Sequence, residues 1–143
     1  MIRFDSWDKV PKSLWVWPNF TPAEMACKGT GRIVVVPDFM DRLQALRVVI
    51  GRPLRIMSGY RSPEHNAKVS STGLTGPHTF GRAVDITIAG PDVYRLIKEA
   101  IRLEFTGIGI SQKGSWDTRF IHVDDLTEEL TEGLHPRPRV WSY

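Results

Sequence analysis

Three residues with metal-binding side chains are the first candidates for chemistry in this sequence. His78 and Asp85 are separated by six residues in "HTFGRAVD", and His122 follows in "FIHVD". Two histidines and one carboxylate are a recurrent ligand set for catalytic zinc, which keeps a fourth position open for water. The three residues therefore form a candidate zinc site, provided that the fold brings them together.

Each of the three residues also has an ordinary structural interpretation. A loop histidine is commonly solvated, a strand aspartate commonly pairs with a cation, and a strand histidine is commonly packed. Spacing alone leaves these alternatives open. Cys27 is the single cysteine, which excludes an intrachain disulfide and a cysteine-based zinc cluster, so any metal must be held mainly by His, Asp or Glu.

Two alternating segments are expected to position these side chains. Residues 82–88 alternate between apolar and other residues, which predicts a strand with Asp85 facing away from the apolar layer. Residues 119–124 predict a second strand, with His122 and Asp124 on the face opposite the core. If the two strands are neighbours, the three candidate ligands can converge at the surface of one sheet.

The rest of the chain predicts an α+β fold, with a small, mainly antiparallel sheet and flanking helices. Residues 59–78 form a loop too long to be a simple connection, which favours a functional role for it. The expected helices are 21–27, 36–53 and 91–105, the last burying Val93, Leu96, Ile97, Ala100 and Ile101, and the further expected strands are 54–58 and 107–110.

The length of 143 residues fits one domain covering 1–143. Within it, residues 1–20 are expected to form an irregular arm packed by its aromatic side chains. Residues 126–143 are expected to wrap around the domain, with Trp141 and Tyr143 packing back onto it.

The charge pattern excludes some partners. The net charge is +3, and the basic residues are interspersed with acidic ones, so no Lys/Arg block marks a nucleic-acid surface. This mild basicity would suit an anionic polymer such as a cell wall. The sequence has no apolar run of about 18 residues and no signal peptide at its start, so we expect no membrane insertion and synthesis in the cytoplasm.

Four motifs occur together in an order that is typical of one peptidase family. They are "SGYRSPEHN" (58–66), "HTFGRAVD" (78–85), "GIGI" (107–110) and "FIHVD" (120–124). With them the sequence resembles the zinc D-alanyl-D-alanine carboxypeptidases, the L-alanyl-D-glutamate peptidases and the murein endopeptidases, whose fold is shared with hedgehog signalling domains. The resemblance covers nearly the whole chain and is greatest to the short phage and bacterial branch.

The resemblance implies roles for four residues. His78, Asp85 and His122 would bind Zn²⁺, and Arg61 of "SGYR" would face the substrate and stabilise the carbonyl oxygen under attack. A fixed guanidinium beside the metal agrees with this role, because oxyanion donors act on charge that develops in the transition state. The alternative for Arg61 is an ion pair that anchors the loop.

The sequence departs from the family pattern at two positions. Gly76 stands two places before the first ligand, where the family often has serine, so a helping hydrogen bond is expected to be absent. Arg119 stands three places before His122, where several relatives carry the catalytic acid. The candidates for the catalytic base are then Asp124, which we favour slightly, and Asp117; the alternatives are that Asp124 orients a ligand and that Asp117 forms a turn.

The other two histidines receive separate predictions. His65, in the long loop, is a candidate substrate-binding residue, and bracing of the loop is the alternative. His135 is expected to be a solvated residue of the C-terminal segment.

Together these features predict a zinc peptidase, of carboxypeptidase or endopeptidase type, that hydrolyses peptidoglycan stem-peptide or cross-link bonds involving D-residues. We expect a monomer that acts on the wall as a phage endolysin released through a holin, or as part of a virion. The alternative is an inactive wall-binding or structural module that keeps zinc but has lost its base, which the arginine at position 119 favours.

Overall fold

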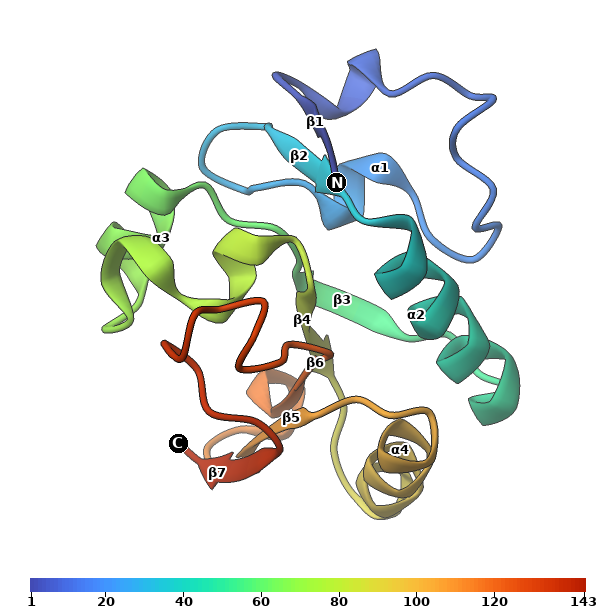
Figure 1. Ribbon diagram of the computed structural model, residues 1–143. Coiled ribbons are helices and arrows are strands. Elements are labelled where there is room, and N and C mark those ends of the chain that lie inside the picture. The colour runs from blue at the N-terminus through green and yellow to red at the C-terminus, as the bar shows by residue number, and fades with distance from the viewer.

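A five-stranded sheet with helices beside it forms the centre of the protein in the computed structural model, which describes all of residues 1–143 (Figure 1). The α+β prediction is confirmed. The strands are β1 (Ile2–Phe4), β2 (Ile33–Val35), β3 (Arg55–Ser58), β4 (Ala83–Thr87), β5 (Gly107–Ser111), β6 (Phe120–Asp124) and β7 (Arg139–Ser142). The α-helices are α1 (Pro22–Met25), α2 (Pro37–Ile50), α3 (Pro63–Val69) and α4 (Pro91–Arg102), and short 3₁₀ helices span Trp7–Lys9, Gly73–Thr75, Pro77–Phe80 and Trp116–Thr118.

The strand order of the main sheet is β3-β4-β6-β5-β7. Every pair is antiparallel except β5 with β7, which run parallel. The strands β4 and β6 are neighbours, as the convergence of the candidate ligands requires, and Asp85 lies directly opposite His122 in their register. The mainly antiparallel sheet expected from the sequence is therefore present.

The core lies between one face of this sheet and the two long helices. Val84 and Ile86 of β4, which alternate with Asp85, are fully buried and belong to one apolar cluster with residues of α2 and α4. In α2 the buried stripe matches its 3.6-residue spacing, and Gly51 ends the helix in a left-handed conformation. The apolar face of the sheet therefore fixes the strands and leaves the opposite face for polar side chains.

The stripe predicted for α4 is only partly correct. Leu96 and Ala100 are buried, but Ile101 is 55% exposed, and Glu99 is buried in its place. The Glu99 carboxylate accepts a hydrogen bond from Arg102 at 3.1 Å, which compensates for its burial. The buried face of α4 is therefore rotated slightly from the face that its apolar residues define, so that Glu99 is buried and Ile101 is exposed.

The first 20 residues are less irregular than the sequence predicts. The strand β1 pairs antiparallel with β2 in a separate two-stranded sheet. Each strand has three residues, which is too short for an alternating pattern to be recognised. Trp17 and Phe20 are buried in the core cluster, so the aromatic packing expected of this arm is present.

The long loop 59–78 contains helical structure that the sequence analysis did not predict. Ser62 caps α3 by accepting a hydrogen bond from the backbone N–H of His65, and Pro63 occupies its first turn. These are the usual signals of a helix start, and they were present in "SPEH". The helix α3 has only seven residues and no clear apolar stripe, so the periodicity of the sequence does not indicate it.

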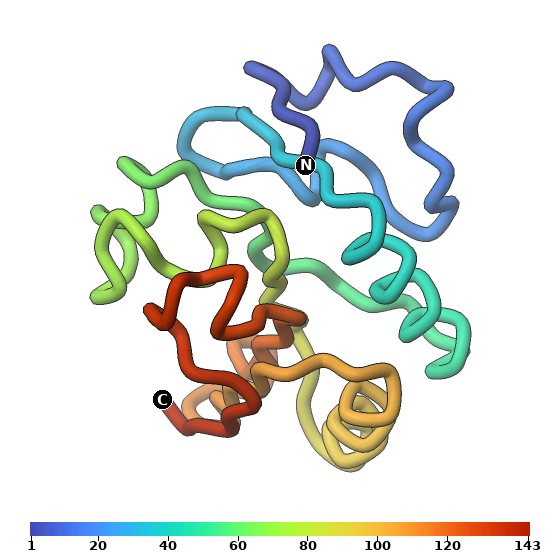
Figure 2. Tube along the Cα trace, viewed as in Figure 1, coloured from blue at the N-terminus to red at the C-terminus, as the bar shows by residue number.

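The C-terminal segment is also more regular than expected, since its last residues form β7. Figure 2 shows this segment beside the part of the chain around residues 70–80, and His135 Nε2 lies 2.7 Å from the carbonyl oxygen of Thr75. None of the helices combines the length and the apolar character needed to cross a lipid bilayer.

Candidate active site

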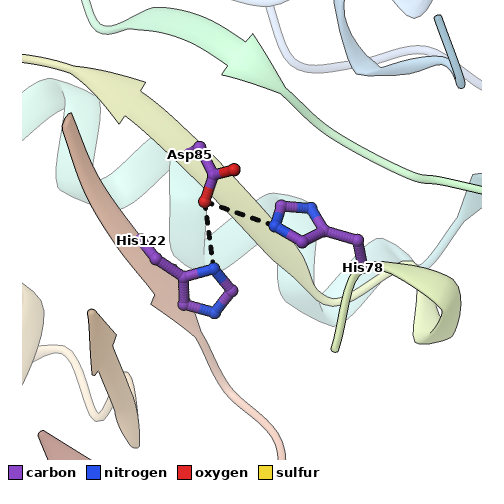
Figure 3. Close-up of side chains that lie close together, drawn as sticks. All are labelled: His78, Asp85 and His122. Atoms are coloured by element: carbon purple, nitrogen blue, oxygen red, sulfur yellow. Dashed lines mark hydrogen bonds and ion pairs between the residues drawn. The ribbon is translucent and has the colours of Figure 1, made fainter. Parts of the chain in front are cut away.

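Three buried side chains meet on the polar face of the sheet (Figure 3). Asp85 Oδ1 lies 3.2 Å from His78 Nε2 and 3.0 Å from His122 Nδ1. The 3₁₀ helix Pro77–Phe80 carries His78, while the other two residues are register partners on β4 and β6. One ligand atom from each residue lies within 4.8 Å of the others, so the three could hold one metal ion.

The positions of protons on the two histidines test whether a cation fits this group. His78 Nδ1 lies 2.7 Å from the carbonyl oxygen of Gly59, and His122 Nε2 lies 2.7 Å from Asp124 Oδ2. Both oxygens can only accept, so these two nitrogens must carry the hydrogens. In the neutral imidazoles the other nitrogens then point lone pairs toward the Asp85 carboxylate. A cation at this point satisfies all three groups, which is the arrangement that metal-binding histidines adopt.

Without a metal, the same group must hold protons. Burial alone would raise the pKa of Asp85, but His78 and His122 outweigh it and hold that pKa far below its usual range. Burial alone would lower the pKa of His122, but hydrogen bonds to Asp124 and Asp85 raise it above its ordinary value. The metal-free site is therefore a cluster of paired charges, and a metal would replace its protons.

Asp124 lies across the His122 ring from Asp85. Its carboxylate accepts from Arg137 Nε at 2.8 Å and from Arg137 Nη2 at 2.7 Å, in addition to the His122 contact, and it also accepts from the backbone N–H of Leu126 at 3.3 Å. These donors outweigh burial and hold the pKa of Asp124 well below its usual range.

The contacts of Asp124 do not favour its predicted role as the base. All four contacts use the carboxylate's lone pairs, and the side chain is fully buried on the far side of the ligand ring. A base must reach a proton of the attacking water, and Asp124 does not line the cavity, so its base role stays a prediction that its position does not favour. The alternative role, orienting His122, agrees with every contact that Asp124 makes.

Arg61 is fixed beside the candidate ligands. Its guanidinium donates to Asp85 Oδ2 at 3.1 Å, to Ser58 Oγ at 3.0 Å and to Asn66 Oδ1 at 3.3 Å. Its backbone N–H also donates to the carbonyl oxygen of His78. A guanidinium has five N–H donors, so two stay free to meet a substrate oxygen. The ion pair and the substrate-facing role are therefore compatible in one residue.

Two glycines of "GIGI" explain how the polar face is built. A Cβ at Gly107 would collide with the Asp124 carboxylate, and one at Gly109 would lie 2.8 Å from the Trp141 ring. Because β5 has no side chain at these points, the Trp141 ring reaches to 5.1 Å from the His122 ring. The motif therefore makes room for the groups that surround His122.

A cavity of about 320 Å³ opens over the three candidate ligands. Arg61 lines it, together with residues of the α3 end and of the C-terminal segment. His135 also lines it; its ring is partly exposed, as the sequence predicts, but it also contacts the Thr75 carbonyl, a partner that the sequence does not predict. The full lining is Arg61, Val69, Ser70, Ser71, Thr72, Pro77, His78, Asp85, Phe120, His122, His135, Arg137, Arg139, Trp141 and Tyr143.

Other predicted site residues lie outside this cavity. His65 packs against Gly29, where a Cβ would collide with its ring, and agrees with a bracing role. Asp117 is exposed on the 3₁₀ helix Trp116–Thr118, and Arg119 lies over the Trp116 ring at 5.3 Å. The base role of Asp117 stays a prediction that its position in the structure does not favour.

Gly76, the first departure from the family pattern, has a local explanation. A Cβ at this position would collide with the Thr72 hydroxyl and lie 2.6 Å from Asn66 Nδ2. The amide of Asn66 donates to that hydroxyl at 2.9 Å and to the Gly73 carbonyl at 2.6 Å. A serine side chain has no room beside this network.

Sequence analysis did not identify the C-terminal part of the site. Arg137 and Arg139 were not singled out, and Trp141 was expected to pack without a stated partner. The sequence does contain a signal for this wall. Large polar or aromatic side chains occupy every second position from 135 to 143, as in a strand that presents one face, and these are the residues that line the cavity. Prolines at 136 and 138 obscured this pattern.

Comparison with known proteins agrees with this geometry. A family model described as peptidase M15 matches residues 18–124, three quarters of the chain. Peptidoglycan L,D-endopeptidase MepK of Escherichia coli K12, of Escherichia coli O157:H7 and of Shigella flexneri is 29% identical over 94 residues. The match covers 62% of this chain and 50% of each relative, so the chain matches about half the length of these curated relatives.

Comparison with solved structures found no significant match. The family match spans all three candidate ligands and ends at Asp124, the residue that contacts His122. Together with the candidate metal ligands described above, this match identifies the chain as a member of the peptidase M15 family.

Proposed function

We propose that the protein is a zinc peptidase that hydrolyses peptide bonds of peptidoglycan. The observation that carries this proposal is the convergence of His78 Nε2, His122 Nδ1 and Asp85 at the floor of an open cavity. Peptidases of the M15 family depend on zinc in general, and the ligand set suits that metal. The peptidoglycan substrate is taken from the name of the relatives.

A zinc ion bound there supplies Lewis-acid chemistry, since it polarises a carbonyl group and acidifies a water molecule near neutral pH. Arg61 complements it with two free N–H donors on a guanidinium that three other contacts hold in place. Such a preorganised donor stabilises the oxygen that becomes negative in the transition state. These contacts already fix the side chain without substrate, so little reorganisation is needed.

The remaining residues keep the ligands in one protonation state. His78 holds its hydrogen on Nδ1 toward Gly59, and His122 holds its hydrogen on Nε2 toward Asp124. Each hydrogen bond fixes both the ring orientation and the nitrogen that is free for the metal. Arg137 in turn fixes Asp124 through two parallel hydrogen bonds.

The bond that is cleaved is a further part of the proposal. The relatives are named L,D-endopeptidases, which supports cleavage of a stem-peptide or cross-link bond that involves a D-residue. Carboxypeptidase action on the same peptides is the alternative that the family resemblance leaves open. Mass analysis of the products separates the two, because a carboxypeptidase releases single amino acids and an endopeptidase releases larger fragments.

The decisive experiment is digestion of purified peptidoglycan by the zinc-loaded protein, followed by mass analysis of soluble fragments. We expect fragments from the wild type, none from Asp85→Asn or after treatment with a chelator, and recovery when zinc is returned. The matched control is Asp8→Asn, which removes an exposed carboxylate far from the site in the sequence and should cleave normally. Absence of fragments from the zinc-loaded wild type on all wall preparations would overturn the proposal.

One observation favours a second candidate function. Asp85 is the only Asp or Glu that lines the cavity, and Arg119 occupies the position where several relatives carry the catalytic acid. A module that holds zinc and binds the wall without cleaving it agrees with this. In the same experiment such a module would sediment with peptidoglycan and release no fragment.

We also propose that the protein reaches the wall through holin-type release from a phage-infected cell or as part of a virion. The resemblance to the short phage and bacterial branch supports this. Immunodetection in purified virions and in the lysate would distinguish the two routes.

A further inference from the structure

The C-terminal strand forms one wall of the cavity. Five alternate residues of this segment line it: His135, Arg137, Arg139, Trp141 and Tyr143. The family match ends at residue 124, so this wall lies outside the part of the chain that the family model describes. Arg137 of this wall supports His122 through Asp124, but the Arg139 side chain makes no hydrogen bond or ion pair with a candidate ligand or with Asp124, so it can serve specificity without disturbing the ligands.

The three arginines of the cavity differ in how they are neutralised. Arg61 pairs with Asp85 at 3.1 Å, and Arg137 pairs with Asp124 at 2.7 Å. Arg139 has no carboxylate within 4.0 Å and donates no side-chain hydrogen bond. The Arg139 guanidinium lies 5.9 Å from the centre of the Trp141 ring. The Arg137 guanidinium lies 5.2 Å from the centre of the same ring.

The positive charge of Arg139 is therefore the one arginine charge in the cavity wall that no carboxylate neutralises. Asp85 and Asp124 are each already paired, and a divalent cation at the ligands would add further positive charge. Arg139 is exposed to solvent, and its guanidinium lies over the Trp141 ring with all of its N–H donors free of protein partners. An anion that enters the cavity therefore finds a guanidinium that no carboxylate of the protein neutralises.

We propose that Arg139, on β7, binds a free carboxylate of the peptide substrate and thereby determines specificity. This inference rests on the proposed function. The cavity of about 320 Å³ holds only a few amino-acid residues, so a carboxylate at Arg139 belongs to a residue close to the bond at the metal site. A guanidinium suits this task, since it can donate two parallel hydrogen bonds to one carboxylate.

The test pairs a change in the protein with a change in the substrate. Soluble wall peptides are made in matched forms, with each free carboxylate in turn replaced by a carboxamide. Values of kcat and KM are measured for the wild type, Arg139→Gln, Arg139→Lys and the control Arg55→Gln. Arg55 is an exposed arginine on β3, and it does not line the cavity.

We expect the wild type to favour the carboxylate form of one peptide by about tenfold in kcat/KM, mainly through KM, which is the usual size of a charge-assisted hydrogen bond. Arg139→Gln should lose this preference, Arg139→Lys should retain part of it, and Arg55→Gln should retain all of it. If Arg139 served only to protect the edge of the sheet, Arg139→Gln would keep the preference, and the inference would be overturned.

The outcomes also separate this inference from the proposed function. Cleavage of both forms at equal rates by the wild type overturns the carboxylate site and leaves the peptidase function standing. Failure to cleave any wall peptide with zinc bound overturns both.

Discussion

The strands β4 and β6 are buried on both faces of the five-stranded sheet, yet the two faces are made of opposite chemistry. On the helix side, Val84 and Ile86 are fully buried among apolar residues. On the other side, Asp85 is 5% exposed and His122 is 1% exposed, although the pKa of Asp85 is lowered and that of His122 is raised, both in the direction that favours the charged form. One face stabilises the fold by removing apolar surface from water. The other holds ionised groups only because each has a fixed partner.

This difference assigns separate tasks to the faces. The apolar face sets the strand register, and the register in turn places Asp85 opposite His122. The polar face depends on that register but contributes charges that are costly to bury without partners. A change on the apolar face should therefore act on stability first, and a change on the polar face should act on metal binding and turnover first.

The strongest way to test the polar face is to remove a ligand. Asp85→Asn, His78→Ala and His122→Ala should each reduce bound zinc from about one per chain to nearly none, because two ligands remain. Metal analysis after dialysis measures this, with circular dichroism to check that each variant is folded. A variant that is folded and retains full zinc would remove that residue from the ligand set.

The corresponding change on the apolar face is Leu46→Ala, which creates a cavity beneath α2. Leu46 is fully buried in the core cluster, so the free energy of unfolding should fall by about 2–5 kcal/mol. Denaturant unfolding gives this value, and zinc content of the folded protein should be unchanged. If the folded Leu46→Ala protein lost its zinc, the apolar face would also control metal binding, and the two faces would not have separate tasks.

Arg61→Ala tests a residue of the polar face that is not a ligand. We expect zinc to be retained and turnover on wall peptides to fall by about 100-fold, because the lost donors act mainly in the transition state. Arg61→Lys should not restore the rate, since it cannot make the three fixed contacts and still face the substrate. Loss of stability with an unchanged rate would assign Arg61 to the ion pair alone.

Asp124→Asn and Asp117→Asn compare a buried carboxylate with an exposed one. Asp124→Asn should weaken zinc binding by about 10- to 100-fold, because it removes the acceptor that orients His122. Asp117→Asn should leave zinc affinity unchanged, since the side chain lies outside the cavity. Zinc titration against a competing chelator measures both. Full zinc affinity in Asp124→Asn together with lost turnover would restore its assignment as the base.

Sequence predicted the apolar face better than its surroundings, for physical reasons. The alternation around Asp85 and His122 is strong because each strand has one face in the core, and this fixed which side chains share a surface. The strand β1 has three residues, too few for a period to be visible, and the prolines at 136 and 138 obscure the alternation that leads into β7. The contact of Arg137 with Asp124 joins residues 13 apart across a turn, which no local pattern encodes.

The position of His135 illustrates the same limit. Its neighbourhood in the sequence is polar and contains proline, as in a solvated tail, but a single hydrogen bond to the carbonyl of Thr75 holds it against a segment 60 residues away. The candidate ligands could be predicted because Asp85 and His122 lie on strands whose sequences alternate between apolar and polar residues. The cavity-lining residues of 135–143 depend on how the C-terminal segment folds back, which no local pattern encodes.

The smallest expected effect concerns pH and the metal-free polar face. The pKa of His122 is raised in the folded protein, so its stabilisation is fully present below the unfolded-state value of about 6.5 and is lost as pH rises through the folded-state pKa. The pKa values of Asp85 and Asp124 are lowered, so their contribution to stability is present above about pH 4 and is lost as pH falls.

Metal-free protein should therefore lose stability above about pH 6.5, whereas zinc, which takes the place of the proton on Nδ1 of His122, should prevent that loss. We expect the increase in Tm caused by zinc to be greater near pH 8 than near pH 6, as measured by thermal unfolding with zinc and with a chelator. Magnesium is the control, because it prefers oxygen ligands and should give no such increase. A zinc-induced shift that stays constant or falls over this range would mean that His122 does not carry the proton that the metal replaces.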